Sequence, residues 1–185
     1  DHFSQYAVVY EVSDNIFEDV TEDDWFYDAV IYAVENGLMN GMSDTLFSPE
    51  NDMTRAMLVT VLYRLDGEAA VTGSNTFDDV ADGQWYTNAV IWASENEIVG
   101  GYGGGLFGTD DSVTREQMAT ILYNYAAYKG YDITASADIT AYADDGDVSA
   151  WAQAALGWAN VEGLINGVTE TTLDPSGSAT RAQVA

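Results

Sequence analysis

Cysteine is absent from the 185 residues of this sequence. Its absence excludes a disulfide framework and any metal or redox site built on cysteine ligands. Long apolar runs are absent too: none approaches the roughly 18 residues that a membrane-spanning helix requires, so we predict no membrane insertion. Histidine occurs once, as His2, and no second histidine lies nearby. We interpret it as a solvated residue at a strand end rather than as a metal ligand or general base.

Positive charge is also scarce, because five Lys and Arg residues stand against 31 Asp and Glu residues, for a net charge of −26. The electric field of such a chain repels nucleic acids and anionic lipids, so neither is predicted as a partner. The hydrophobic content of 47% and the aromatic content of 12% are nevertheless far above those of a disordered chain. The sequence is therefore predicted to fold as a polyanion.

The first thirteen residues differ from the rest. Tyr6, Val8, Tyr10 and Val12 alternate with a period of two, which is typical of a strand, and no clear pairing partner follows. We interpret residues 1–13 as the C-terminal strand and linker of an upstream β domain. The chain begins at Asp1 without a methionine or a signal pattern, which indicates a piece of a longer, processed protein.

From residue 14 onward the sequence repeats three times. In each copy a glycine follows a tryptophan by 16 residues, and an arginine follows that glycine by 14. The copies are offset by 60 and then 66 residues, and the extra length lies in connectors, where insertions are tolerated. The predicted repeats are residues 14–73, 74–137 and 138–185. Their shared positions are Trp25, Trp85 and Trp151; Gly41, Gly101 and Gly167; and Arg55, Arg115 and Arg181.

Each repeat is predicted to be helix, loop, helix, so the expected fold class is all-α. The first helix begins at the tryptophan and carries one apolar stripe. The loop then passes through Asn40-Gly41, Gly100-Gly101 or Asn166-Gly167, dipeptides that tolerate positive φ and mark tight turns. The second helix begins at an N-cap threonine and is apolar nearly all round, which places it in a central helical bundle. The N-cap residues are Thr54, Thr114 and Thr180.

The third repeat is predicted to be incomplete. Its second helix stops at Ala185 after about one turn, and a helix that short is not stable by itself. We expect this end of the chain to be frayed or supported from elsewhere.

The three repeat arginines begin the second helices, where the partial positive charge of the helix disfavours a cation by roughly 0.3–1 kcal/mol. Our preferred hypothesis is an anion site, in which each guanidinium and the free helix N–H groups bind a carboxylate or phosphate. The alternative is a structural salt bridge to the nearby acidic loop, for example from Arg115 to Asp110 or Asp111.

Two further sets of residues have competing interpretations. For the three tryptophans, packing in the core at helix starts is favoured over stacking against a sugar. The acidic clusters before the first helices complement the helix dipole and increase solubility. Calcium binding is the alternative for these clusters, although their spacing does not match the twelve-residue calcium loop, and otherwise no metal or cofactor is predicted. The clusters include Glu18-Asp19, Asp78-Asp79 and Asp144-Asp145.

With these features the sequence resembles a tandem of three S-layer homology domains. The resemblance rests on the Gly dipeptides, on the Thr-Arg-Ala-Glu-like motif at each second helix, on Phe-x-Asp-Val before two of the tryptophans and on a Phe-x-Pro loop. It implies a pseudo-threefold arrangement of the repeats, with a groove between each pair of neighbours. It also implies that the motif arginines hold acidic groups, typically the pyruvate ketal, of a secondary cell-wall polysaccharide. Such a module anchors a larger extracellular protein non-covalently to the wall or surface layer of a bacterium.

The predicted function is thus wall anchoring through an acidic polysaccharide. Self-assembly as a structural subunit of a surface layer and an acidic calcium-binding module are the alternatives. An enzyme is not predicted, because the carboxylates lie in helix-start clusters with no apolar enclosure to raise a pKa. The candidate ligand-binding residues are Arg55, Arg115, Arg181, Thr54, Thr114, Thr180, Gly41, Gly100, Gly101, Gly167, Asn40 and Asn166, with Trp25, Trp85 and Trp151 as candidates for sugar stacking.

Overall fold

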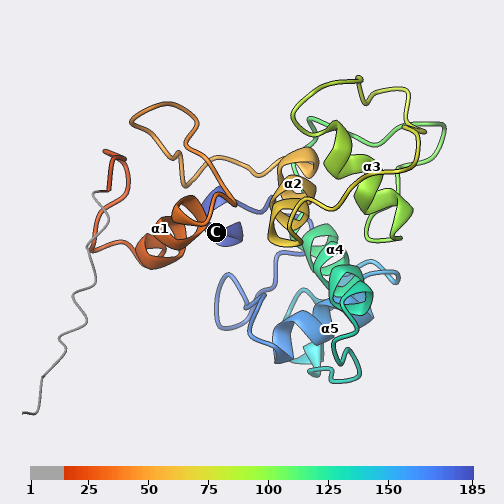
Figure 1. Ribbon diagram of the computed structural model, residues 1–185. Coiled ribbons are helices and arrows are strands. Elements are labelled where there is room, and N and C mark those ends of the chain that lie inside the picture. Colours follow the sequence, from red (N-terminus) through yellow and green to blue (C-terminus); the bar gives the residue numbers. More distant parts are fainter. Residues whose placement is uncertain (1–14) are drawn as a thin grey trace, which may run out of the picture.

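The computed structural model describes residues 15–185, so the predicted strand over residues 1–13 and His2 lie outside the described residues. Between residues 15 and 185 the regular structure is helical, with only isolated β-bridges, which confirms the all-α class (Figure 1). The helices are α1 (Tyr27–Glu35), α2 (Arg55–Leu65), α3 (Thr87–Glu95), α4 (Arg115–Tyr128), α5 (Gln153–Val161) and α6 (Arg181–Val184), with short 3-10 helices η1 (Ile139–Ala141) and η2 (Asp145–Asp147).

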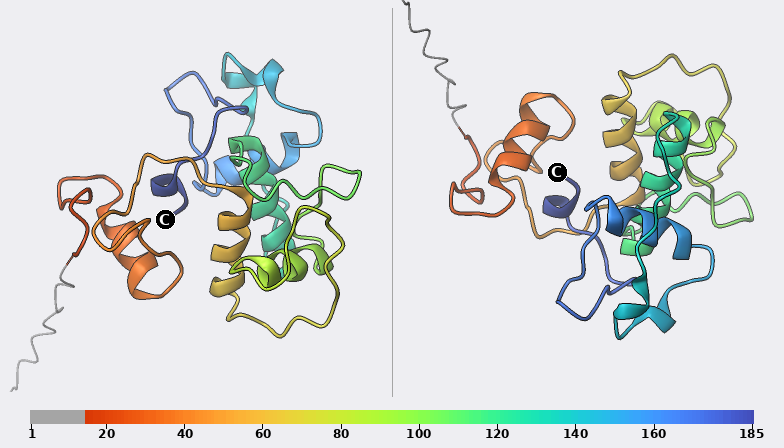
Figure 2. Two further views of the ribbon diagram at one scale, coloured as in Figure 1. Left: turned by 90° about the horizontal axis from the view of Figure 1, so that it is seen from above. Right: turned by 90° about the horizontal axis from the view of Figure 1, so that it is seen from below.

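The second helices of the repeats lie at the centre and the first helices lie outside them, as predicted. Helices α2 and α4 occupy the middle of the molecule, while α1, α3 and α5 surround them (Figures 1 and 2). Helix α3 packs against α2, and α5 packs against α4, so a first helix packs on the second helix of the preceding repeat. Helix α6 lies near α1 (Figures 1 and 2). The amides of Arg181 and Ala182 donate to the carbonyls of Asn51 and Pro49, both at 2.9 Å, and these bonds close the three repeats into a ring.

A ring of backbone hydrogen bonds joins the residues just before the three central helices. The amide of Met53 donates to the carbonyl of Ala179 at 2.8 Å, the amide of Ala179 donates to Val113 at 2.9 Å, and the amide of Val113 donates to Met53 at 2.8 Å. All three residues are fully buried. These bonds use one donor and one acceptor from each repeat, which is the hydrogen-bond pattern of a pseudo-threefold axis.

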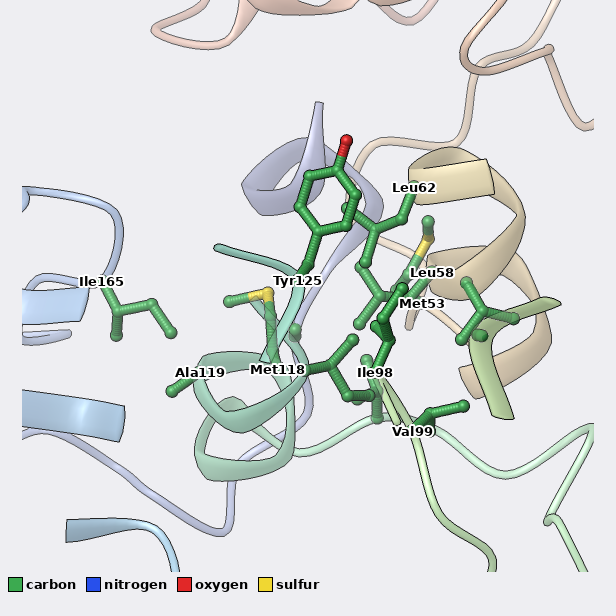
Figure 3. Close-up of a cluster of buried hydrophobic side chains, with 14 of the residues drawn as sticks. Met53, Leu58, Leu62, Ile98, Val99, Met118, Ala119, Tyr125 and Ile165 are labelled. Carbon is green, nitrogen blue, oxygen red and sulfur yellow. The ribbon is translucent and has the colours of Figure 1, made fainter. Parts of the chain in front are cut away.

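The hydrophobic core continues outward from this ring. Figure 3 shows side chains of α2, such as Leu58 and Leu62, converging with Met118 of α4 and with Ile98, which follows α3. Each of these side chains is at most 3% exposed, and burying a side chain of this size stabilises the fold by about 1.5–3 kcal/mol. The core therefore joins residues from different repeats.

Two predictions about the first helices are wrong. These helices begin two residues after the repeat tryptophan, which lies in the preceding turn. The tryptophans are not packed in the core: Trp25, Trp85 and Trp151 are 74%, 57% and 56% exposed. The core positions belong instead to two other tryptophans, Trp92 and Trp158, which lie on α3 and α5.

The reason proposed for the Gly dipeptides is also wrong, because none of their residues has a positive φ. Glycine is required at the second position of each dipeptide, because an aromatic ring and backbone carbonyl oxygens approach it closely. A Cβ atom on Gly41 would lie 2.5 Å from Cε1 of Phe17, and one on Gly101 would lie 2.6 Å from Cε1 of Phe77. Positive φ occurs instead at the ends of the first helices, at Gly37 (67°) and Gly163 (73°), where glycine is the favoured residue.

Candidate functional site

Three buried arginines connect neighbouring repeats, and we call them the bridging arginines. Nε of Arg55 donates to the carbonyl of Phe107 at 3.0 Å, and Nη2 donates to the carbonyl of Gly100 at 2.8 Å. Both acceptors lie in the loop of the next repeat. The other two bridging arginines repeat this geometry, and all three are only 4–5% exposed. Their acceptors are Leu173 and Asn166 for Arg115, and Phe47 and Asn40 for Arg181.

The N–H groups at the start of the central helices are occupied as well. The amide of Arg55 donates to the backbone carbonyl of Asp111 at 3.0 Å, and the amide of Ala56 donates to the backbone carbonyl of Thr109 at 3.3 Å. The next amide, of Met57, donates to the hydroxyl of Thr54 at 3.2 Å. Corresponding bonds occur at α4 and α6. The hypothesis that free helix N–H groups bind an anion is therefore wrong.

The salt-bridge alternative is wrong too. The guanidinium groups bind backbone carbonyls, and Lys129–Asp66, at 2.6 Å, is the single ion pair within residues 15–185. The negative ends of carbonyl dipoles therefore compensate the buried charges. Burial lowers the pKa of each bridging arginine, while neighbouring groups such as Tyr102 and Asp111 beside Arg55 oppose that effect. A guanidinium nonetheless stays protonated in proteins, so the sites remain cationic.

The three N-cap threonines act as predicted. Their hydroxyls accept from the third amide of each second helix, and Gln117 and Gln183 complete capping boxes with Thr114 and Thr180. The threonines lie outside the grooves described below. Their hydroxyls are used by the helix itself.

An aspartate in each repeat holds the loop that receives the bridging arginine. Asp79 accepts from the amides of Phe107 and Gly108, both at 2.7 Å. Burial alone would raise the pKa of Asp79, but these backbone bonds lower it by more, so the pKa lies below its ordinary value. The peptide group between Phe107 and Gly108 thus donates to Asp79 while accepting from Arg55. Asp19 and Asp144 make the same loop contacts, so these acids of the clusters bind loops rather than complementing helix dipoles.

Three grooves open between the repeats, and all three are built alike. Each is lined by the Gly dipeptide of one repeat, by the bridging arginine of the preceding repeat and by the exposed tryptophan of the following repeat. Grooves 1 and 2 have volumes of about 230 and 240 Å³, and groove 3 about 540 Å³. The pairs are Arg181 with Trp85 in groove 1, Arg55 with Trp151 in groove 2, and Arg115 with Trp25 in groove 3.

Hydrogen-bond donors remain unused along these grooves. Nη1 of each bridging arginine has no hydrogen-bond partner among the described residues. This atom is not completely buried, because the fully buried unpaired side-chain nitrogens there are Nε1 of Trp92 and Trp158. The backbone amides of the dipeptides likewise donate to no acceptor between residues 15 and 185. These dipeptides are Asn40-Gly41, Gly100-Gly101 and Asn166-Gly167.

Carboxylate side chains are absent from the lining of the same grooves. No Asp or Glu lines any of the three grooves, although the chain contains 31 of them. Each groove therefore offers a cation, two free amides and an aromatic face, which together suit a sugar that carries an acidic group.

Among the groove residues that sequence reasoning missed are Arg64 and Tyr102. Arg64 lines groove 1 together with Arg181, and Tyr102 lines groove 2, where its ring centroid lies 4.6 Å from Cζ of Arg55. The scarcity of cations could have identified Arg64, because a chain with five basic residues places few of them by chance. No comparable signal marks Tyr102, since tyrosine is common in this sequence.

The acidic side chains were also the candidates for a calcium site. No group of three or more His, Asp or Glu side chains is placed to hold a metal ion within residues 15–185. Over the same range, no helix is both long and apolar enough to cross a membrane.

Comparison with known proteins agrees with the repeat structure. The chain matches the S-layer homology domain over residues 16–56, 76–119 and 141–185. It is 35% identical over its full length to an amylopullulanase of Thermoanaerobacterium thermosulfurigenes, of which it covers 10%. It is 32% identical, over 78% of its length, to a cellulosome-anchoring protein of Acetivibrio thermocellus, of which it covers 33%. It is 29% identical, over 85% of its length, to a surface-layer 125 kDa protein of Lysinibacillus sphaericus, of which it covers 13%.

The chain thus spans a third or less of the length of these relatives. The three matched regions make up more than half of its residues, and each contains one exposed tryptophan, one Gly dipeptide and one bridging arginine. The chain belongs to the S-layer homology domain family.

Proposed function

We propose that this chain anchors a larger protein to the bacterial cell wall by binding an acidic polysaccharide in its grooves. Membership of the family places it at the cell surface, in a wall-anchoring or surface-layer role. The observation that carries the finer proposal is the charge distribution: a protein of net charge −26 lines none of its three grooves with a carboxylate and lines each with an arginine. A neutral ligand would not require that exclusion.

The groove contents favour a carboxylate substituent on a sugar, such as a pyruvate ketal. Nη1 of the bridging arginine and the amides of the Gly dipeptide can share one carboxylate, since charge-assisted bonds to such a group are the stronger kind. The exposed tryptophan offers an apolar face for the sugar ring. Volumes of about 230 and 240 Å³ in grooves 1 and 2 lie below the ~300–1,000 Å³ of pockets for drug-sized ligands, so each suits about one sugar unit.

No catalytic activity is proposed for this chain. The amylopullulanase is named as an enzyme, but the chain covers only 10% of it. The cellulosome-anchoring protein and the surface-layer protein are named for roles that need no catalysis.

The proposal is tested through the tryptophans, because they are exposed whereas the bridging arginines also hold the fold. We expect Trp85→Ala and Trp151→Ala each to weaken sedimentation with purified cell walls by about tenfold, and the triple variant with Trp25→Ala to abolish it. Chemical removal of the acidic polymer from the walls should have the same effect on the native protein. Tyr131→Ala is the control, because Tyr131 is 62% exposed and lines none of the three grooves.

Full wall binding by the triple tryptophan variant, with circular dichroism unchanged, would refute the proposal. Sedimentation velocity over a range of protein concentrations separates wall binding from self-assembly in a surface layer. Wall binding predicts a constant sedimentation coefficient in the absence of polymer, whereas self-assembly predicts a coefficient that rises with concentration.

A further inference from the structure

Groove 1 differs from groove 2 by one full charge. Arg64, in the last turn of α2, lines groove 1, and the equivalent residue of α4 in groove 2 is Asn124. The two residues hold their loops in the same way. Nη1 of Arg64 donates to the carbonyl of Leu38 at 3.0 Å, and Nδ2 of Asn124 donates to the carbonyl of Ile98 at 3.2 Å. A neutral amide therefore suffices for the structural contact, and the charge of Arg64 is additional.

The additional charge has no carboxylate partner. Arg64 is half-buried and belongs to no ion pair within residues 15–185, and no acidic residue lines groove 1. Arg181 lines the same groove, so two arginines share the wall of one cavity of about 230 Å³. Two cations at one cavity repel one another, and a ligand with two anionic groups reduces that repulsion.

The walls of groove 1 strengthen this effect. Four of the five methionines of the chain line it, so much of its wall is apolar. Electrostatic attraction is larger where water is excluded. These methionines are Met39, Met42, Met53 and Met57.

We propose that groove 1 selects a doubly charged acidic sugar, with one anionic group bound by Arg181 and the other by Arg64, while groove 2 takes a singly charged one. This inference rests on the proposed binding of acidic glycans and assigns the difference in specificity to one position, Arg64 against Asn124. The three grooves are thus not interchangeable copies of one site.

The test uses two tryptophans as separate reporters in one protein. The indole N–H signal of Trp85 reports groove 1 and that of Trp151 reports groove 2 in ¹H–¹⁵N spectra, which detect weak binding. The probes are glucuronic acid, with one carboxylate, and glucuronic acid 2-sulfate, with a carboxylate and a sulfate ester that carry one negative charge each. At each groove we compare the affinity for the second probe with the affinity for the first. In the native protein this ratio should be about tenfold higher at groove 1 than at groove 2.

Reciprocal variants provide the decisive comparison. Arg64→Asn should lower the affinity ratio at groove 1 to that of groove 2, and Asn124→Arg should raise the ratio at groove 2. Each variant places a residue that the equivalent helix already carries, so the bond to the loop carbonyl is retained, and circular dichroism checks the fold. Equal ratios at both grooves of the native protein, an unchanged ratio in Arg64→Asn, or no response of either indole to either probe would overturn the inference. A different measurement decides the proposed function, which is refuted if the native protein does not sediment with cell walls.

Discussion

Replacing Arg181 by alanine should destabilise the whole molecule, because this side chain closes the ring between the third and first repeats. Its Nε and Nη2 donate to the carbonyls of Phe47 and Asn40 at 2.9 and 2.7 Å, across more than 130 residues of sequence. Phe47 is fully buried, and Cζ of Arg181 lies 4.5 Å from the centroid of its ring. Truncation therefore removes two charge-assisted hydrogen bonds and the stacking contact together.

The expected loss follows from these contacts. A hydrogen bond to a charged group contributes about 1.5–3 kcal/mol, so two of them give a loss of about 4 kcal/mol. That is a large share of the ~5–15 kcal/mol by which proteins of this kind are stable. At about 3 °C per kcal/mol for a chain of this size, the midpoint of thermal unfolding should fall by about 12 °C.

Urea unfolding followed by circular dichroism at neutral pH measures this loss. Arg181→Lys keeps the charge but cannot donate two bonds in the same plane, so it should lose about half as much free energy of unfolding as Arg181→Ala. Arg64→Ala is the matched control, because Arg64 is half-buried and makes one bond to a carbonyl. A loss below about 1 kcal/mol for Arg181→Ala, or an equal loss for Arg64→Ala, would refute the structural role assigned to the bridging arginines.

Three further predictions concern stability. Glu97 has a φ of 58° where the equivalent Gly37 has 67°, so Glu97→Gly should raise the free energy of unfolding by about 1 kcal/mol, and a lower melting temperature would contradict this. The folded state lowers the pKa of Asp79 and Asp144. The stabilisation by these two carboxylates is therefore present above about pH 4 and is lost as the pH falls through the folded pKa values. The urea midpoint should drop over this acidic range, and it should drop less steeply for Asp79→Asn. A net charge of −26 opposes the compact state, so raising NaCl to about 1 M should raise the urea midpoint, and an unchanged midpoint would contradict this.

Much of the fold follows from local patterns. The spacing of tryptophan, glycine and arginine predicts the three repeats, and Thr114 with Gln117 predicts a capping box that the structure contains. The central position of the second helices follows from their apolar composition. These features depend on residues close together in the sequence, which is why sequence alone predicts them.

The features that were missed depend on contacts between distant residues. Arg55 binds the carbonyls of Gly100 and Phe107, and a backbone carbonyl has no residue type that a sequence could reveal. The requirement for glycine at position 41 comes from the ring of Phe17, which approaches from another part of the repeat. The exposure of Trp25 depends on the helix starting at Tyr27, a boundary that propensity places only to within a few residues. The sugar preference and the calcium alternative stay predictions.

The structural role of the bridging arginine and the proposed ligand binding meet at one peptide group in each groove. Nη2 of Arg181 donates to the carbonyl of Asn40, and the N–H of that same peptide belongs to Gly41, which lines groove 1 and donates to no acceptor within residues 15–185. A cation bound to the carbonyl polarises the peptide and makes its N–H a stronger donor. A side chain at this position would collide with Phe17, so glycine leaves the amide uncovered. The bridging arginine therefore closes the ring of repeats, positions the donor amide and presents its own Nη1 to the same groove. Loss of wall binding in an arginine variant would consequently measure all three effects at once. A tryptophan variant would measure the contact with the ligand alone.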